Sequence, residues 1–200
     1  MLAIFIDIES TGLDPKVHSV IDIALKLVNF TTNSIESSYQ STVDISLSEW
    51  EARDPESIKI NGYTQQMLSF GKKREKVTCD IIEFFKKNEI VRKKAVFICQ
   101  NPAFDRIFFA QLVNFHLQEQ LFWPYHWLDL ASMYWAFSYK KYLDENITFP
   151  ETFSVSKNEI AEKYGLPSET QPHRAINGVD HLIKCYEAIF NVEFKCVKNT

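Results

Sequence analysis

The segment that most restricts the fold is the apolar run LAIFIDI at residues 2–8, which contains one acidic residue and is soon followed by another. Its apolar and β-branched character is typical of a strand buried on both faces. Side chains two residues apart on a strand point to the same face, so Asp7 and Glu9 are expected to project together from its end. Two such carboxylates repel each other unless a cation lies between them. The pair therefore indicates either a cation site or a solvated strand end with salt-bridged acids.

The next segments predict an antiparallel meander. A turn at STGLDP, with Gly12 and Pro15 as breakers, separates the first strand from a second strand at 19–29. A turn at TTNS then leads to a third strand at 36–45, and a short buried strand is expected at 95–100.

Helices are expected between and after these strands. Helical spacing and start signals predict them at about 64–69, at 75–88, from Pro102 onward, and at 127–137, 156–164 and 178–190. Residues 48–60 and 139–152 are predicted to be loops, and Asn199 and Thr200 to be frayed. This order predicts an α/β fold with a mixed β-sheet, an antiparallel meander plus parallel strands, flanked by helices.

Composition restricts the class of protein. The chain has 200 residues and 46% apolar content, which suits a single domain over residues 1–200 with a well-filled core. No apolar stretch approaches the roughly 20 residues that span a bilayer, and no secretory signal is recognisable. The four cysteines lack zinc-ligand spacing and are predicted to be reduced, mostly buried thiols of a cytoplasmic protein. A net charge of −4 predicts that any contact with nucleic acid is short, local or mediated by metal cations.

Two further segments carry polar residues of interest. In QNPAFDRIFF, Asp105 lies in the first turns of a predicted helix, where an acid ordinarily complements the helix dipole, and Asn101 is a plausible N-cap. In QPHRAINGVDH, His173 precedes the final helix, and a lone loop histidine is ordinarily a surface residue.

Together, FIDIESTGLDP, NPAFDR and HRA resemble, in this order, the DEDD-type 3′–5′ exonucleases, specifically their histidine-containing DEDDh branch. That branch includes proofreading subunits of DNA polymerases, oligoribonuclease and RNase T-like enzymes. The resemblance extends from residue 3 to about residue 190, and D-x-E-x-T-G-L is its most specific motif. It implies a ribonuclease H-like fold, which agrees with the predicted element order.

The resemblance also implies roles for the polar residues. Two Mg²⁺ or Mn²⁺ ions would assist phosphodiester hydrolysis, because hard divalent ions prefer carboxylate oxygens. Asp7 would bridge both ions, Glu9 would hold one, and Asp105 would bind directly or through water. His173 would be the general base, a task that suits histidine near neutral pH.

Substrate contacts are implied by the same motifs. In the family, the backbone of the first motif contacts the 3′-terminal nucleotide, and an apolar side chain rests against its base. This assigns Thr11, Gly12 and Leu13 to substrate binding, with Leu13 as the base contact, although a half-buried turn residue is an equally ordinary role for it. Asn101 joins them from the second motif.

The third motif departs from the family pattern H-x-A-x-x-D, because position 178 is glycine and the nearest acid is Asp180. In one account, an Asn177–Gly178 turn lengthens the loop, and Asp180 starts the helix and reaches the metal. In the other, the helix starts earlier and Gly178 replaces the ligand, leaving Asp180 about 200° away around the helix. We adopt the first account here, because a site with three acids and a catalytic histidine rarely discards its fourth ligand.

The sequence thus predicts a divalent-metal-dependent 3′–5′ exonuclease that acts on single-stranded DNA or RNA 3′ ends or on short oligonucleotides and releases nucleoside 5′-monophosphates. The alternative from another class is a weak or inactive nuclease-like module that binds nucleic-acid ends or proteins. No membrane partner is expected, and the aromatic content would allow a homodimer.

Overall fold

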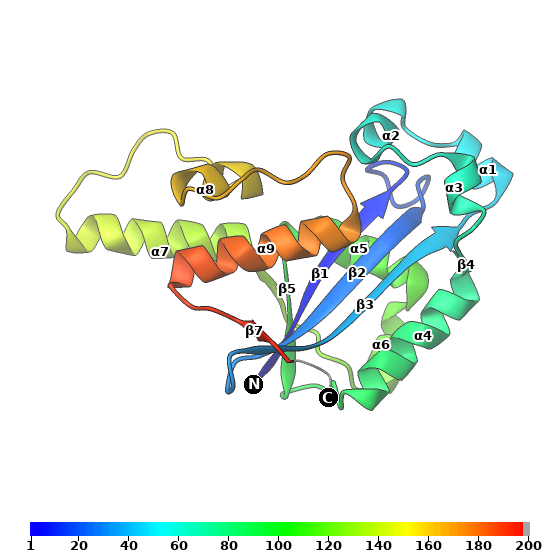
Figure 1. Ribbon diagram of the computed structural model, residues 1–200, viewed down its shortest axis with the longest axis horizontal. Coiled ribbons are helices and arrows are strands. Elements are labelled where there is room, and N and C mark those ends of the chain that lie inside the picture. Colours follow the sequence, from blue (N-terminus) through cyan, green and yellow to red (C-terminus); the bar gives the residue numbers. More distant parts are fainter. Residues whose placement is uncertain (198–200) are drawn as a thin grey trace.

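The computed structural model describes residues 1–197, so the predicted fraying of Asn199 and Thr200 lies outside the described residues. Within this range a mixed sheet has the strand order β4-β3-β2-β1-β5-β6, with β7 paired to β3 (Figure 1). The strands are β1 (Leu2–Ser10), β2 (Val20–Asn29), β3 (Ser34–Asp44), β4 (Lys72–Lys73), β5 (Ala95–Cys99), β6 (Trp127–Asp129) and β7 (Lys195–Cys196). β1, β2 and β3 form the predicted antiparallel meander, and β5 adds to β1 in parallel.

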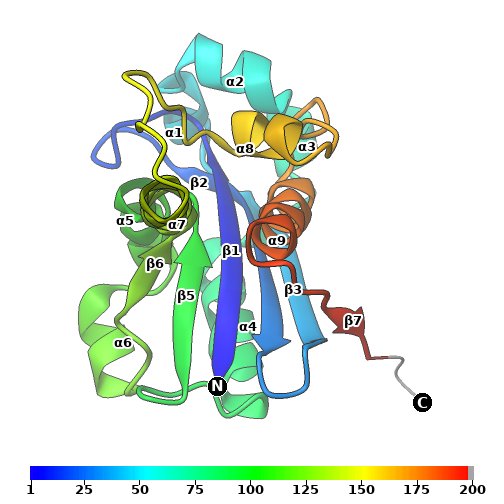
Figure 2. The ribbon, with the colours of Figure 1, turned by 90° about the vertical axis from the view of Figure 1, so that its left-hand side faces the viewer.

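Helices cover both faces of the sheet (Figures 1 and 2). One face packs against α4 (Arg74–Lys87) and α5 (Pro102–Leu112). The other packs against α7 (Leu130–Asp144), α8 (Lys157–Lys163) and α9 (Ala175–Phe190). The shorter helices are α1 (Leu47–Glu51), α2 (Pro55–Asn61), α3 (Gln65–Leu68) and α6 (Phe115–Gln120).

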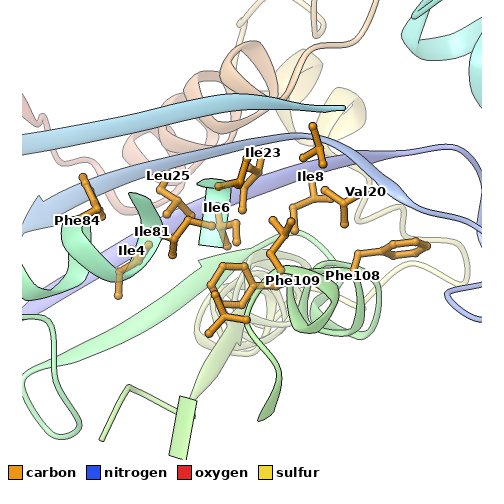
Figure 3. Close-up of a cluster of buried hydrophobic side chains, with 14 of the residues drawn as sticks. Ile4, Ile6, Ile8, Val20, Ile23, Leu25, Ile81, Phe84, Phe108 and Phe109 are labelled. Atoms are coloured by element: carbon orange, nitrogen blue, oxygen red, sulfur yellow. The ribbon is translucent and has the colours of Figure 1, made fainter. Parts of the chain in front are cut away.

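β1 separates two hydrophobic clusters, because its side chains alternate between the faces of the sheet. One set meets α4 and α5 in the cluster drawn in Figure 3 and consists of Ile4, Ile6 and Ile8. Ala3 and Phe5 point to the opposite face and pack in the cluster that includes α9. The odd-numbered residues of β1 therefore face α9.

The prediction of a loop over 48–60 is wrong, because two short helices occupy most of it. Ser46 and Glu49 form a reciprocal capping box at the start of α1. Asp54 caps α2, in which Pro55 is the first residue. These capping interactions satisfy the backbone N–H groups that a short polar segment would otherwise leave to water.

The predicted boundary between a helix at 127–137 and a loop at 139–152 is also shifted. Residues 127–129 form β6 beside β5, and the Asp129 side chain accepts hydrogen bonds from the first turn of α7. The helix then continues to Asp144, so only the remainder of the predicted loop lacks helix. The prediction that the cysteines are mostly buried is confirmed for Cys99 and Cys185 and is wrong for Cys79 and Cys196, which are exposed.

No helix within residues 1–197 combines the length and the apolar character that crossing a bilayer would need.

Candidate functional site

A cleft of about 240 Å³ opens at the carboxyl end of β1. It is bounded by β1 and its following turn, by α2 and α5, by the first residue of α8, and by the segment that precedes α9. Its polar lining includes the side chains of Asp7, Glu9, Asp105, Lys157, Glu169 and His173. Segments far apart in the sequence thus bring four acidic residues, one lysine and one histidine to a single cavity.

Three of the predicted acidic residues reach the cleft from two elements. Asp7 and Glu9 continue the row of β1 side chains that faces α9, in keeping with the period of two. Asp105 lies in the first turn of α5, which Pro102 opens, and is only 4% exposed. The side chain of Asp7 is 16% exposed, so these carboxylates are held largely away from solvent.

His173 is fixed by contacts with α2 and the residues that follow it. Its backbone N–H donates to the carbonyl of Ile60 at 3.2 Å. The next residue, Arg174, lies over the ring of Tyr63 at 4.0 Å and donates to the carbonyl of Asn61. Nε2 of His173 is buried and has no hydrogen-bond partner among residues 1–197. This nitrogen therefore remains available to a ligand of the cleft.

The start of α9 corrects the sequence prediction. The helix begins at Ala175, whose backbone N–H donates to the Asp22 carboxylate at 3.0 Å. Tyr63 donates its hydroxyl to the same carboxylate at 2.7 Å, so a buried acceptor on β2 anchors this helix end. The predicted Asn177–Gly178 turn is wrong, because both residues lie in the first turns of α9.

Gly178 occupies the position where the family pattern has its fourth acid. It is buried in α9, and a β-carbon at this position would overlap the carboxylate of Asp7. The absence of a side chain therefore allows the Asp7 carboxylate to lie directly against the helix.

Asp180 does not line the cleft, so the prediction that it reaches the site is also wrong. Its carboxylate forms an ion pair with Lys26 on β2, and its side chain is 42% exposed. The physical reason is the early start of α9, because residues two apart on a helix point in very different directions.

We accordingly expect Asp180→Asn to leave the catalytic rate of this site within about twofold of wild type. The partly exposed pair with Lys26 contributes on the order of 1 kcal/mol to stability. Steady-state rates of the purified variant check this expectation. A loss of tenfold or more would contradict the position of Asp180 outside the site.

Two residues of the cleft were missed by sequence reasoning. Nζ of Lys157 lies 2.9 Å from Oδ1 of Asp7 and 3.0 Å from Oε2 of Glu169. Oε1 of Glu169 lies 3.9 Å from Nδ1 of His173. The lack of an acid at position 178 was a signal to look for another one near His173, and Glu169 lies four residues before it.

Burial raises the pKa values of three acidic residues in this cleft, Asp7, Glu9 and Asp105. It raises the pKa of Asp7 against the opposing effect of Lys157, and burial together with the charge of Asp7 raises that of Asp105. Burial, then the charges of Asp7 and Glu169, raise the pKa of Glu9 to about 8. Burial lowers the pKa of Lys157, but Asp7 and Glu169 outweigh it and raise the pKa overall. Lys157 is therefore the cation that partly neutralises the cluster.

The donor set fits a hard divalent cation. Glu9, Glu169 and His173 each offer one ligand atom within 4.8 Å of the others. Carboxylate oxygens are the ligands that Mg²⁺ prefers, and Mn²⁺ accepts both carboxylate and imidazole. A divalent cation would also offset the burial and the repulsion by Asp7 and Glu169 that together raise the pKa of Glu9.

A dependence of stability on pH follows from Glu9. Its pKa is 4.5 in an unstructured chain and about 8 in the folded protein without metal. Between these values the folded state retains a proton that the unfolded state has lost, so the free energy of unfolding falls as pH rises. We expect the thermal midpoint in EDTA to fall from pH 5 to pH 8.5, and Mn²⁺ to reverse most of that fall.

Differential scanning fluorimetry across this pH range measures the effect. Glu9→Gln is the control, because it removes one of the titrating groups and should make the fall in EDTA less steep, while Asp7 and Asp105 still contribute to it. Identical slopes for wild type and Glu9→Gln would contradict the raised pKa.

The predicted substrate residues are divided between the cleft and its surroundings. Leu13 lines the cleft and is 75% exposed, so its side chain is accessible. Thr11 is buried and exchanges hydrogen bonds with Ser19, and a β-carbon at Gly12 would overlap the ring of His18. Asn101 is exposed with a φ of 59° and makes no side-chain cap hydrogen bond. Thr11, Gly12 and Asn101 do not line the cleft.

Comparison with known proteins gives a family match. The model of the RNase T family, which is described as an exonuclease family, matches residues 4–186. No curated protein gives a sequence match to this chain.

Solved structures of exonucleases share the fold. The nuclease domain of 3'hExo, described as a DEDDh family member bound to rAMP, matches with a TM-score of 0.67 and 18% identity, over 100% of this chain and 97% of that chain. A 3'-exonuclease that recognises a histone mRNA stem-loop matches with a TM-score of 0.68 and 19% identity, over 96% and 65%. E. coli exonuclease I in complex with a dT13 oligonucleotide matches with a TM-score of 0.66 and 18% identity, over 94% and 40%.

The chain thus spans less than two thirds of the last two of these proteins. The likeness confirms the predicted ribonuclease H-like fold, a mixed sheet flanked by helices.

Proposed function

The chain belongs to the RNase T exonuclease family, and we propose that it is a divalent-metal-dependent 3′–5′ exonuclease that removes nucleoside 5′-monophosphates from single-stranded ends. The observation that carries this proposal is the meeting of Asp7, Glu9, Asp105 and His173 in one cleft at the end of β1. We also propose that residues 1–200 form one catalytic domain and that the protein works in the cytoplasm, in keeping with its four free cysteines.

The buried carboxylates would hold Mg²⁺ or Mn²⁺. Asp7 is the central ligand, because its carboxylate lies between the wall formed by α9 and the ammonium group of Lys157. Glu9 and Asp105 flank it. Two bound ions would stabilise the charge on the attacking and leaving oxygens of the phosphodiester.

His173 supplies the general base in this proposal. Its Nε2 is buried and has no hydrogen-bond partner in the part of the chain that the structure describes, so it can accept the proton of the attacking water. Its Nδ1 faces Oε1 of Glu169 at 3.9 Å, which favours a ring orientation with Nε2 toward the cleft. A carboxylate on that side also stabilises the imidazolium that forms when the proton is taken.

The terminal base of the substrate would rest against apolar side chains at the mouth of the cleft. Leu13 and Ile60 are exposed and line it, and Phe104 lines it from the first turn of α5. Such contacts suit the face of any base, so they hold an end without selecting a sequence. With a net charge of −4, the chain is expected to contact only a few terminal nucleotides.

A 5′-labelled single strand tests this function. With Mg²⁺ or Mn²⁺ the protein should shorten it stepwise from the 3′ end and release nucleoside 5′-monophosphates, and EDTA should stop the reaction. Parallel DNA, RNA and two- to five-nucleotide substrates identify the preferred class. Cleavage inside a circular strand, or no cleavage with any metal, would contradict the proposal.

A non-catalytic module that binds nucleic-acid ends is the second candidate. Gly178 in place of an acid, and Lys157 paired with Asp7, favour it, because an internal ammonium could neutralise the cluster without metal. Binding of a labelled 3′ end with equal affinity in Mn²⁺ and EDTA, and without cleavage, would support the module. Cleavage that requires Mn²⁺ would exclude it.

A further inference from the structure

The loop between α8 and α9 carries an acidic residue that the family pattern does not include. Glu169 is four residues before His173, and its side chain is 4% exposed. Its backbone N–H donates to the side chain of Asn158 in α8 at 2.9 Å, which fixes this part of the loop. A buried carboxylate is costly unless a cation or hydrogen-bond donors face it, so its placement in the cleft requires a partner.

That partner is the ammonium group of Lys157, which also contacts Asp7. Nζ of Lys157 lies 3.0 Å from Oε2 of Glu169 and 2.9 Å from Oδ1 of Asp7. The two carboxylates therefore already bracket one positive charge. Glu169 also offers a ligand atom within 4.8 Å of atoms from Glu9 and His173.

The first turn of α9, beside Asp7, lacks the acid that the family pattern has there. Position 178 is glycine, and any side chain there would overlap the Asp7 carboxylate. Asp180, the next acid along α9, pairs with Lys26 outside the cleft. The cleft therefore has no carboxylate from position 178 but has a buried one from Glu169, so it still contains four acidic residues.

We propose that Glu169 is the fourth acidic ligand of this site, supplied from the loop before His173 in place of the side chain that position 178 lacks. Without metal, Lys157 holds Glu169 beside Asp7. A divalent cation that binds there competes with the Lys157 ammonium group for the same two carboxylates. This inference rests on the proposed function, since it concerns the metal site of the same cleft.

Direct Mn²⁺ binding tests the inference independently of catalysis. Titration calorimetry, or the electron paramagnetic resonance of free Mn²⁺, gives the dissociation constant without substrate. We expect Glu169→Gln to weaken Mn²⁺ binding at least tenfold. Glu159→Gln is the matched control, since it makes the same change at an exposed position of α8, and it should leave the constant unchanged.

A second pair of variants separates ligation from support of Lys157. In Lys157→Met, Glu169 has no ammonium partner to hold. A Glu169 that acts only by holding Lys157 would then have no effect on Mn²⁺ binding, whereas a ligand would still cause a loss of tenfold or more in Lys157→Met/Glu169→Gln, measured against Lys157→Met alone. Far-UV circular dichroism confirms that each variant is folded before titration.

The outcomes distinguish the two proposals. If wild type binds Mn²⁺, Asp7→Asn weakens it and Glu169→Gln does not, the assignment of Glu169 is overturned and the proposed nuclease function stands. If wild type binds no Mn²⁺ and cleaves no substrate, both are overturned. A tenfold loss for Glu169→Gln in both backgrounds, with Glu159→Gln unchanged, supports the assignment.

Discussion

Replacing Asp7 with asparagine is expected to reduce the exonuclease rate by more than about 10³-fold, the upper end of the loss for a single electrostatic group in an active site. A loss at this upper end is expected for Asp7 because its carboxylate is central to the cluster. It borders Lys157, Gly178 and the other acids. The isosteric amide keeps the shape of the site and removes the charge that a divalent cation requires.

Single-turnover rates with a 3′-labelled strand in saturating Mn²⁺ measure this effect. Asp144→Asn is the control, since it makes the same change in an exposed pair with Lys140. The thermal midpoint of Asp7→Asn in EDTA should stay close to that of wild type, because the change removes one of several mutually repelling buried carboxylates. An Asp7→Asn protein with wild-type rates would refute the catalytic role of this cluster.

Replacing His173 with asparagine is expected to reduce kcat by about 10² to 10⁴-fold, the usual contribution of a general base. The KM for substrate should change much less, because the side chain acts on the attacking water and not on the bound strand. Mn²⁺ binding should weaken only moderately, since the buried carboxylates remain.

The split between kcat and KM is the measurement that distinguishes a base from a structural residue. His116→Asn is the matched control, because His116 is exposed on α6 and does not line the cleft. A variant of His173 that loses affinity for substrate but keeps kcat would contradict the assignment of a general base. Recovery of the rate at higher pH would support it, because hydroxide can replace the base.

Local sequence patterns predicted the parts of the fold that depend on short-range periodicity. The alternation along β1 placed Asp7 and Glu9 on one face, and the structure brings both to the same cleft. The strong turn signals between strands predicted the meander of β1, β2 and β3. The short helices α1 and α2 were missed because their capping residues resemble those of a polar loop.

Contacts between distant segments determine where α9 begins and why position 178 is glycine, and local sequence patterns did not predict them. Asn177 and Gly178 are a strong turn signal by themselves, yet the buried carboxylate of Asp22 anchors the backbone of Ala175 and starts α9 earlier. Glycine at 178 is explained by the close approach of Asp7, which no local pattern reveals.

Lys157 and Glu169 illustrate the same limit of local patterns. They are twelve positions apart in the printed sequence, and nothing in either segment indicates that both meet Asp7. Their convergence depends on how α8 and the following loop pack against the sheet.

A crystal structure with Mn²⁺, with data collected at the manganese absorption edge, tests the central claim most directly. The proposed function predicts at least one anomalous peak within about 2.5 Å of a carboxylate oxygen of Asp7, with Glu9 and Glu169 as further neighbours and the ammonium group of Lys157 moved away from Glu169. A cleft without a manganese peak at saturating Mn²⁺, with Lys157 still bound to both Asp7 and Glu169, would contradict it.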